Sequence, residues 1–258
     1  MQFHVLASGS AGNATFIDFD GVGVLIDCGI SKKQLVYRLN LVGYGLDDIK
    51  YVFLTHDHYD HKKNIHVFNR HLIYSAIGCY DGLDDDHYLT PYDVLQFDHF
   101  MMIPLKTSHD ATASLGFEFI CQEQRLIYMT DTGYVSSKNA NYMVDADYYI
   151  IESNHDVEML MNTNRPMSLK NRILSDKGHL SNLDSALLMC RLMGTHTKEI
   201  VLAHLSREAN TAELALQTYH DVFRENHIDL GHCQIKVASQ IDVVSGGEID
   251  ENQSAVCR

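Results

Sequence analysis

Short apolar runs, separated by polar or glycine-containing turns, recur along the whole chain. Runs of about 4–8 residues that are rich in branched and aromatic side chains are typical of β-strands. In the first half they predict strands at residues 3–6, 14–19, 23–26, 51–54 and 101–105. In the second half they predict strands at residues 116–121, 125–129, 148–151 and 199–203.

Signals for helix starts alternate with these strands. Ser31 is followed three residues later by Gln34, which is the pattern of a capping box. A second helix is expected to begin at Asp60. Ser181 and Asn210 each precede an acidic residue by three positions, and apolar residues follow at helical spacing. Strands followed by helices in both halves predict an α/β (α+β) fold in which two sheets lie between helix layers.

The composition is that of a packed globular protein. Apolar residues make up 45% of the 258 residues, only three prolines occur, and no linker-like stretch divides the chain, so we expect a single domain over residues 1–258. The polar end, residues 246–258, is expected to be a flexible tail. Six scattered cysteines form no C-x-x-C pair, which favours a reducing cytoplasm over a disulfide framework. No basic leader and no membrane-spanning apolar stretch is visible, so we expect a cytoplasmic protein without a membrane partner.

The chain is strongly acidic. Its 34 acidic and 20 basic side chains give a formal net charge of −14. Such a charge repels polyanions and argues against broad binding to long nucleic acid. A small anionic ligand that is held by local groups is easier to accommodate, and divalent cations would offset part of the negative charge.

The densest chemistry lies directly after the fourth predicted strand. Residues 55–61 (THDHYDH) place three imidazoles and two carboxylates in one short segment. Imidazole and carboxylate are the ligands that borderline divalent metals prefer. A turn at the end of a strand lets His56 and His58 face one ion while Asp60 and His61 face another. The segment therefore predicts a metal site, since a solvated loop rarely reaches this density by chance.

Three further strand ends carry candidate ligands. His109, Asp131 and His204 follow the strands that are predicted to end at residues 105, 129 and 203. Taken singly, such residues are more often histidines at the edge of a core or capping aspartates. Together they complete a ligand set for two ions, which residues 55–61 alone could not supply.

The order of these residues resembles the motif series of the metallo-β-lactamase superfamily, and more narrowly its YycJ/WalJ-like branch. Matching strings cover almost the whole chain: residues 6–13 (LASGSAGN), 25–29 (LIDCG), 131–134 (DTGY), 152–156 (ESNHD), 178–182 (GHLSN) and 202–206 (LAHLS). The resemblance implies a four-layer αββα sandwich with two divalent ions, Zn²⁺ or alternatively Mn²⁺. The implied ligands are imidazoles and carboxylates at strand ends: His56, His58 and His109 for one ion, Asp60, His61 and His204 for the other, and Asp131 between them.

Other residues are expected to support this site or to line it. Asp27, at the end of a predicted strand, is either a hydrogen-bond acceptor behind the cluster or a turn residue. His179 precedes a capped helix start, where anions are favoured, so we expect it to bind phosphate or to protonate the leaving group, unless it only packs in a turn. Asp60 and His179 are thus the expected catalytic residues. Asn154, His179 and Ser206 are the expected substrate contacts.

Two segments depart from the pattern of the branch. Residues 66–98 match it poorly, and residues 164–167 read Asn-Arg-Pro-Met in a chain without tryptophan. Both are expected near the mouth of the site or at a subunit contact, since the resemblance implies a homodimer. Substrate size is therefore the property that the sequence specifies least.

Three functions follow from the resemblance and the charge. The branch contains DNA exonucleases and phage-encoded phosphodiesterases that degrade cyclic-nucleotide immune signals. The resemblance and the acidic chain together favour a phosphodiesterase that converts 3′,5′-cyclic nucleotides to linear monophosphates. The resemblance also implies a phage-encoded protein that acts in a bacterial cell. The alternative is a 5′-to-3′ DNA exonuclease, which would need a basic track that the sequence does not display. A non-catalytic metal- or nucleotide-binding homologue is the third interpretation, and the complete ligand set argues against it.

Overall fold

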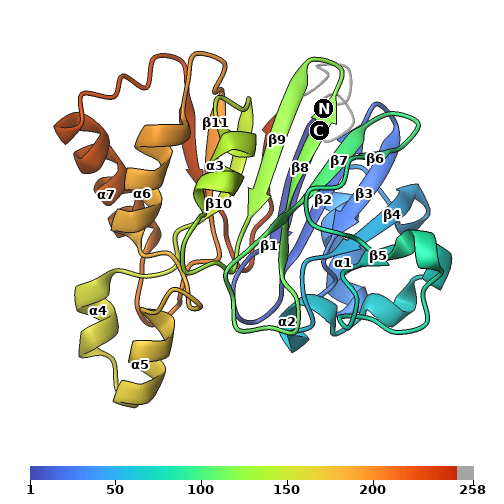
Figure 1. Ribbon diagram of the computed structural model, residues 1–258, viewed down its shortest axis with the longest axis horizontal. Coiled ribbons are helices and arrows are strands. Elements are labelled where there is room, and N and C mark those ends of the chain that lie inside the picture. The colour runs from blue at the N-terminus through green and yellow to red at the C-terminus, as the bar shows by residue number, and fades with distance from the viewer. Residues whose placement is uncertain (249–258) are drawn as a thin grey trace.

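Two mixed β-sheets lie face to face at the centre of the computed structural model, which describes residues 1–248 (Figure 1). The strand order is β13-β1-β2-β3-β4-β5 in the first sheet and β12-β11-β10-β9-β8-β7-β6 in the second. The strands of the first sheet are β1 (Gln2–Ala7), β2 (Ala14–Phe19), β3 (Val22–Ile26), β4 (Ile49–Leu54), β5 (Ile73–Ser75) and β13 (Val244–Gly247). Those of the second are β6 (Leu95–Gln96), β7 (Met101–Lys106), β8 (Leu115–Cys121), β9 (Gln124–Met129), β10 (Tyr148–Glu152), β11 (Glu199–Ala203) and β12 (Gln234–Val237).

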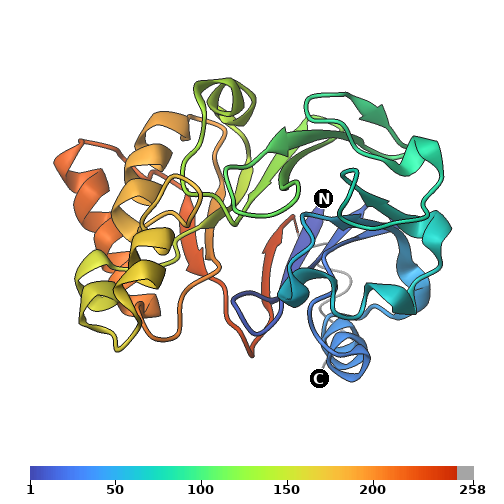
Figure 2. The same ribbon diagram turned by 60° about the horizontal axis from the view of Figure 1, so that its bottom comes forward.

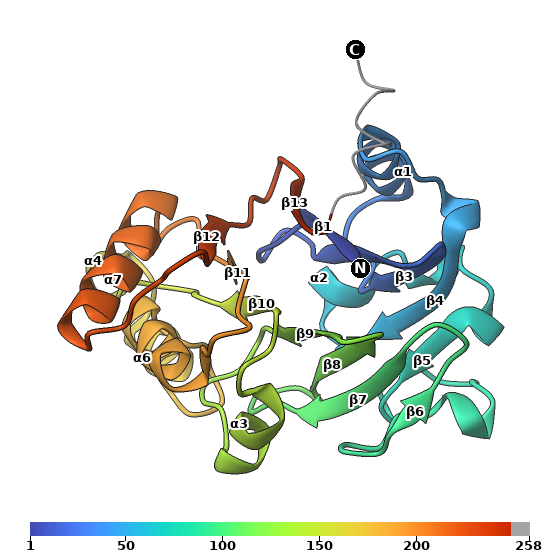
Figure 3. The same ribbon diagram turned by 90° about the horizontal axis from the view of Figure 1, so that it is seen from above.

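Seven α-helices lie within residues 1–248, and four of them cover the outer faces of the sheets. Their bounds are α1 (Lys32–Leu41), α2 (Tyr59–Lys62), α3 (Ser137–Met143), α4 (Val157–Asn162), α5 (Met167–Ile173), α6 (Asn182–Leu192) and α7 (Ala212–Glu225). Helix α1 lies on the first sheet, whereas α3, α6 and α7 lie on the second (Figure 3). The predicted four-layer αββα sandwich is therefore confirmed. Within residues 1–248, no helix combines the length and the apolar character that crossing a bilayer requires.

The second sheet is buried on both faces, and the sequence of β10 shows why. Tyr148 and Ile150 belong to the core between the two sheets, whereas Tyr149 and Ile151 pack with apolar side chains of α6 and α7. All four side chains are at most 1% exposed. Since successive side chains of a strand point to opposite faces, a strand covered on both sides must be a continuous apolar run.

The strand directions bring several strand ends to one edge of the molecule. Strands β3, β4 and β5 run parallel in the first sheet, and β9, β10, β11 and β12 run parallel in the second. Strand β7 is antiparallel to β8, which is antiparallel to β9, so β7 and β9 end at the same edge. Figure 2 turns this edge toward the viewer, with α2 and the loops that follow the strands.

The helix starts agree with the capping signals, with one correction. Ser31 and Ser181 cap α1 and α6 as predicted, and the capping box at Ser31 is complete. Helix α7 is capped by Thr211, and not by Asn210 as expected. The Asn210 side chain is engaged elsewhere, because its Nδ2 donates to the carbonyl oxygen of Ser153 at 2.9 Å.

The expectation of a flexible tail over residues 246–258 is wrong where the structure describes it. Gly246 and Gly247 belong to β13, which pairs with β1 through Phe3 and Gln2. A Cβ at Gly246 would overlap the Phe3 ring, so glycine lets the two strands approach. Residues 249–258 lie outside the described residues.

The poorly matching segment 66–98 forms edges of both sheets. It contains β5, which pairs with β4, and β6, which pairs with β7. The second divergent segment, residues 164–167, lies between α4 and α5.

Candidate metal centre

Six polar positions lie at strand ends on the edge that Figure 2 shows. They come from both sheets. Those of the first sheet are Asp27 after β3 and the histidine-rich segment after β4, and those of the second are His109 after β7, Asp131 after β9, Glu152 at the end of β10 and His204 after β11.

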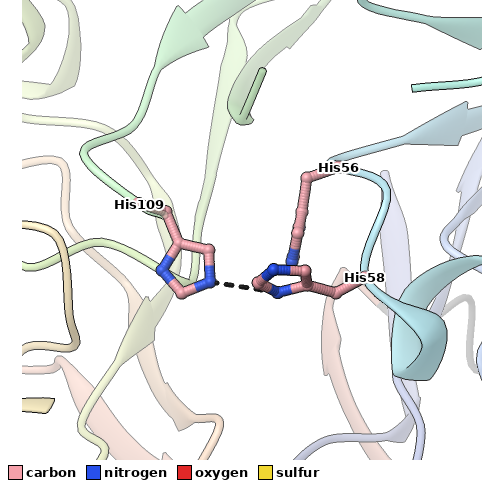
Figure 4. A group of neighbouring side chains, drawn as sticks. All are labelled: His56, His58 and His109. Atoms are coloured by element: carbon pink, nitrogen blue, oxygen red, sulfur yellow. Dashed lines mark hydrogen bonds between the residues drawn. The ribbon is translucent and has the colours of Figure 1, made fainter. Parts of the chain in front are cut away.

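The first group of candidate ligands consists of His56, His58 and His109. Their ring nitrogens lie within 4.8 Å of one another. The Nδ1 of His58 is 3.3 Å from the Nε2 of His109, and all three rings converge on one point (Figure 4). His109 Nδ1 donates to the carbonyl oxygen of Gly178 at 3.2 Å, which leaves Nε2 as the acceptor that faces the other imidazoles.

The second group consists of Asp60, His61 and His204, again with ligand atoms within 4.8 Å of one another. Asp60 and His61 lie on helix α2. This helix begins at Tyr59, one residue before the predicted start. The Nδ1 of His61 lies 2.7 Å from Oδ2 of Asp27, a carboxylate with no solvent exposure. Asp27 thus lies behind His61 as an acceptor, which is the first of the two roles expected for it.

Asp131 lies between the two groups. Its Oδ2 is 3.3 Å from Nε2 of His61, and its Oδ1 is 3.7 Å from Nε2 of His109 and 3.5 Å from Nδ1 of His204. A carboxylate in this position can offer one oxygen to each of two ions. The structure therefore brings together all seven residues that were expected to be ligands.

The backbone at three of these strand ends is unusual. Asp27, Asp131 and His204 have φ values of 61°, 54° and 58°, in the left-handed region that side chains other than glycine seldom occupy. Such conformations persist where the surrounding structure enforces them, and they concentrate at functional sites. Here each of the three residues follows the end of its strand by one or two positions.

Unpartnered atoms test whether a metal would fit. Within residues 1–248, Nε2 of His56, Oδ2 of Asp131 and Nε2 of His204 are buried without a hydrogen-bond partner. Buried polar atoms are nearly always paired. These three belong to candidate ligands: His56 and Asp131 share one group of close ligand atoms, and Asp131 and His204 share another. Their chemistry and burial fit divalent metal ions.

The charges around the site also favour a cation. Burial alone would lower the pKa of His61 and His204, but neighbouring carboxylates outweigh it. Asp27 and Asp131 raise the pKa of His61 to about 9, and Asp131 together with Glu152 raises the pKa of His204 to about 10. The carboxylates around His61 and His204 thus stabilise positive charge at this part of the site, and divalent ions would supply it.

Glu152 is the residue that the sequence reasoning missed. Its Oε1 is 2.8 Å from Nδ1 of His179 and 2.9 Å from Nδ1 of His204. Its Oε2 accepts hydrogen bonds from the backbone N–H groups of Thr132 and Leu180 at 2.9 and 3.2 Å. The carboxylate is fully buried and orients both imidazoles. The available signal was an acidic residue that ends the apolar run of β10.

His179 lies next to the candidate ligands, as expected. Its ring centroid is 5.1 Å from that of His109 and 5.3 Å from that of His204, and its side chain is 18% exposed. Since Nδ1 is bound to Glu152, the other ring nitrogen is the one available to a substrate.

Asn154 and Ser206, the other two expected substrate contacts, lie at the loop that carries His204. The side-chain Nδ2 of Asn154 donates to the backbone carbonyl oxygen of His204 at 2.8 Å. The backbone carbonyl oxygen of Asn154 accepts from the backbone N–H of Ser206 at 2.7 Å. Both side chains are only 6% exposed. The Asn154 side chain and the backbone N–H of Ser206 hold the loop that carries His204, where the left-handed backbone leaves the His204 carbonyl without a partner in the sheet.

Comparisons with known proteins agree with this geometry. Residues 23–205 match the model of the β-lactamase superfamily domain. The chain is 35% identical over 244 residues to exodeoxyribonuclease WalJ of Streptococcus pneumoniae, covering 89% of this chain and 91% of that one. It is 34% identical over 245 residues to exodeoxyribonuclease YycJ of Bacillus anthracis, with 90% and 93% covered.

A solved structure shows the same fold. The metallo-β-lactamase fold protein YhfI from Bacillus subtilis superposes with a TM-score of 0.67 at 15% identity, over 95% of this chain and 99% of its own. The fold implies divalent metal ions, and the candidate ligands of this chain lie at the ends of its strands. The chain therefore belongs to the metallo-β-lactamase superfamily, and it is a metal-dependent hydrolase.

Proposed function

We propose that the protein is an exodeoxyribonuclease that removes nucleotides from the 5′ end of DNA with two divalent ions. The observation that carries this proposal is the complete ligand set in a chain that is 35% identical to exodeoxyribonuclease WalJ over 89% of its length. An inactive homologue would be free to lose ligands. A zinc pair and a homodimer belong to the same proposal.

Different residues of the chain would bind the ions and transfer the proton during hydrolysis. Divalent ions bound at this site would activate a water and stabilise the negative charge that develops on the phosphate. Asp131 would hold both ions at a fixed separation. His179 lies beside the ligands and is oriented by Glu152, so its free ring nitrogen can hold a proton near the leaving oxygen.

The relatives favour this function over the expected cleavage of 3′,5′-cyclic nucleotides. The net charge of −14 was the reason to prefer a small substrate. Recognition of a DNA end, however, depends on the charges near the site, because exposed charges further away are screened within about 10 Å at moderate salt.

The test compares three substrates with the same metal-loaded protein: linear 5′-phosphorylated DNA, circular single-stranded DNA, and 3′,5′-cyclic nucleotides. We expect mononucleotides from the linear DNA and none from the circle. Linear monophosphate from the cyclic substrates with intact DNA would refute the proposal. Asp131→Ala should abolish turnover, whereas Asp221→Ala, an exposed change on α7, should leave it unchanged.

A further inference from the structure

A cavity of about 460 Å³ opens beside the metal centre, and His109 forms part of its wall. Its volume lies within the roughly 300–1,000 Å³ that is usual for small-ligand sites. Lys106 is the last residue of β7, Ser108 lies in the loop that follows it, and Tyr134 lies in the loop after β9. Lys177, which precedes the candidate catalytic His179 by two residues, completes the rim.

Two lysines without an ion pair among the described residues lie in the wall of this cavity. Lys106 and Lys177 are both exposed. The lysines that form ion pairs with carboxylates within residues 1–248 are Lys198 and Lys236, which are not in the cavity wall. The two ammonium groups are therefore available to an anionic ligand, and the hydroxyl groups of the wall add neutral donors.

Aromatic side chains form another part of the wall. Tyr134 is 48% exposed. Tyr92 is fixed by its hydroxyl group, which donates to Oδ1 of Asn139 at 3.1 Å, and by Lys138, whose Nζ lies 3.4 Å from the ring centroid. Tyr134 thus offers a free aromatic face, and bases stack on such faces without regard to sequence. Tyr92 comes from the segment 66–98, which departs from the pattern of related chains.

We infer that this cavity binds the terminal 5′-nucleotide of a DNA strand. Lys106 and Lys177 contact its 5′-phosphate, Tyr134 stacks on its base, and the next phosphodiester lies at the metal centre beside His109. The inference rests on the proposed nuclease function and specifies how that site recognises a strand end.

The chemistry explains why a cationic cavity suits a 5′ end. Water adds to the phosphorus, the bond between phosphorus and O3′ breaks, and the O3′ atom takes up a proton. The released nucleotide keeps its 5′-phosphate and gains a 3′-hydroxyl, while the shortened strand begins with a new 5′-phosphate. Each cut therefore regenerates the group that the two lysines bind. A 3′-terminal nucleotide would bring no additional phosphate into the cavity.

The experiment compares one oligonucleotide with a 5′-phosphate and with a 5′-hydroxyl. The wild-type protein should prefer the phosphorylated form in kcat/KM. The double variant Lys106→Ala/Lys177→Ala should reduce this preference by about 10- to 100-fold, as expected for lost charge-assisted hydrogen bonds to phosphate. Lys32→Ala/Lys33→Ala removes the same charge from the exposed start of α1 and should retain the preference. Elemental analysis of each variant checks that bound metal is unchanged.

A binding measurement separates failure of this inference from failure of the proposed function. Calorimetric titration with thymidine 5′-monophosphate should show binding to the wild type, weaker binding to the double lysine variant and to Tyr134→Ala, and recovery in Tyr134→Phe. Equal turnover of both oligonucleotides, or equal nucleotide affinity in all variants, would overturn the inference. If the wild type binds the nucleotide but leaves all DNA intact, the nuclease function fails and the nucleotide cavity stands.

Discussion

At the scale of single residues, the metal centre depends on carboxylates that accept hydrogen bonds from the imidazole nitrogens facing away from it. Asp27 accepts from Nδ1 of His61, and Glu152 accepts from Nδ1 of both His179 and His204. In each case the hydrogen bond fixes the tautomer and turns Nε2 toward the centre.

Glu152→Gln should weaken metal binding by about 10- to 100-fold, the usual effect of losing such a partner. Both oxygens of the carboxylate are acceptors, one for two imidazoles and the other for the backbone N–H groups of Thr132 and Leu180. Either orientation of an amide would therefore turn its NH₂ group toward other donors. Competition with a chelating dye measures the affinity, and Glu225→Gln at the exposed end of α7 is the matched control. Wild-type affinity in the Glu152 variant would contradict this role.

His4 provides a prediction about pH that does not involve the metal ligands. It is 5% exposed, and its Nδ1 lies 2.7 Å from the Ser245 hydroxyl oxygen. Burial lowers the pKa of His4 from 6.5 to about 4. The unfolded chain therefore binds a proton at this residue between pH 6.5 and 4 while the folded chain does not. The stability that the neutral ring contributes is complete above pH 6.5 and is lost as the pH falls toward 4.

His4→Gln should accordingly make the free energy of unfolding less dependent on pH over this interval. The pH-dependent part of the free energy of unfolding that the variant loses is at most about 3 kcal/mol, because each unit of pKa shift corresponds to about 1.4 kcal/mol. Urea unfolding at pH 7 and pH 4.5 measures it, and His155, whose pKa burial also lowers to about 4, contributes equally to both proteins. Parallel pH profiles of the two proteins would show that His4 is not the group responsible.

At the scale of elements, apolar runs identified β1 to β4 and β7 to β11, whereas the short strands β5 and β6, of three and two residues, were missed. Strands β2 and β11 have the predicted bounds, residues 14–19 and 199–203. Strands β12 and β13 were missed, because their side chains are largely half-buried and β13 ends in two glycines. Their strand conformation comes from backbone pairing with β11 and β1, which are distant in the sequence.

The same distinction applies to the candidate site. A ligand at the end of a buried strand could be predicted, because parallel strands deliver their ends to one edge. The contacts of a side chain could not be predicted, as Asn154 shows: it follows β10 at the correct edge, yet its Nδ2 donates to the backbone carbonyl oxygen of His204. Glu152 was missed for the opposite reason, since the last residue of a strand can point into the protein.

Gly29 shows how closely two elements of the site are packed. It lies in the loop between β3 and α1, where its N–H donates to the carbonyl oxygen of Asn13 at 2.8 Å. A Cβ at this position would overlap the backbone carbonyl of Asp60. Gly29→Ala should therefore destabilise the fold by about 1–3 kcal/mol, as overpacking does, and should lower metal content by displacing Asp60.

Thermal unfolding and elemental analysis together measure this effect. Gly45→Ala is the control, because an added Cβ would meet only Oδ2 of Asp48, at 3.8 Å. If the Gly29 variant kept both its midpoint temperature and its metal content, the contact between the loop and α2 would not position the ligand.

At the scale of the whole molecule, the metal centre joins the two sheets. His56, His58, Asp60 and His61 follow β4 in the first sheet, whereas the other candidate ligands follow β7, β9 and β11 in the second. Below the centre the sheets share one apolar core, which includes residues of both. At the edge, however, buried carboxylates and imidazoles face one another across the interface. Without cations, this part of the interface is held only by hydrogen bonds and by protons on histidines.

Metal binding should therefore stabilise the fold as a whole, because ions that bind only the folded chain shift the folding equilibrium. At a free metal concentration 100 times the dissociation constant, one site contributes about 2.7 kcal/mol. Removal of metal with a chelator should lower the midpoint of thermal unfolding, and added Zn²⁺ or Mn²⁺ should restore it. Asp131→Asn keeps the size of the side chain between the two groups but loses its charge, so this variant should lose most of the metal-dependent increment, whereas Asp221→Ala should keep it. A midpoint that does not respond to chelator in the wild-type protein would mean that the two sheets are held together without the ions, and that these ligand atoms do not bind metal in the folded state.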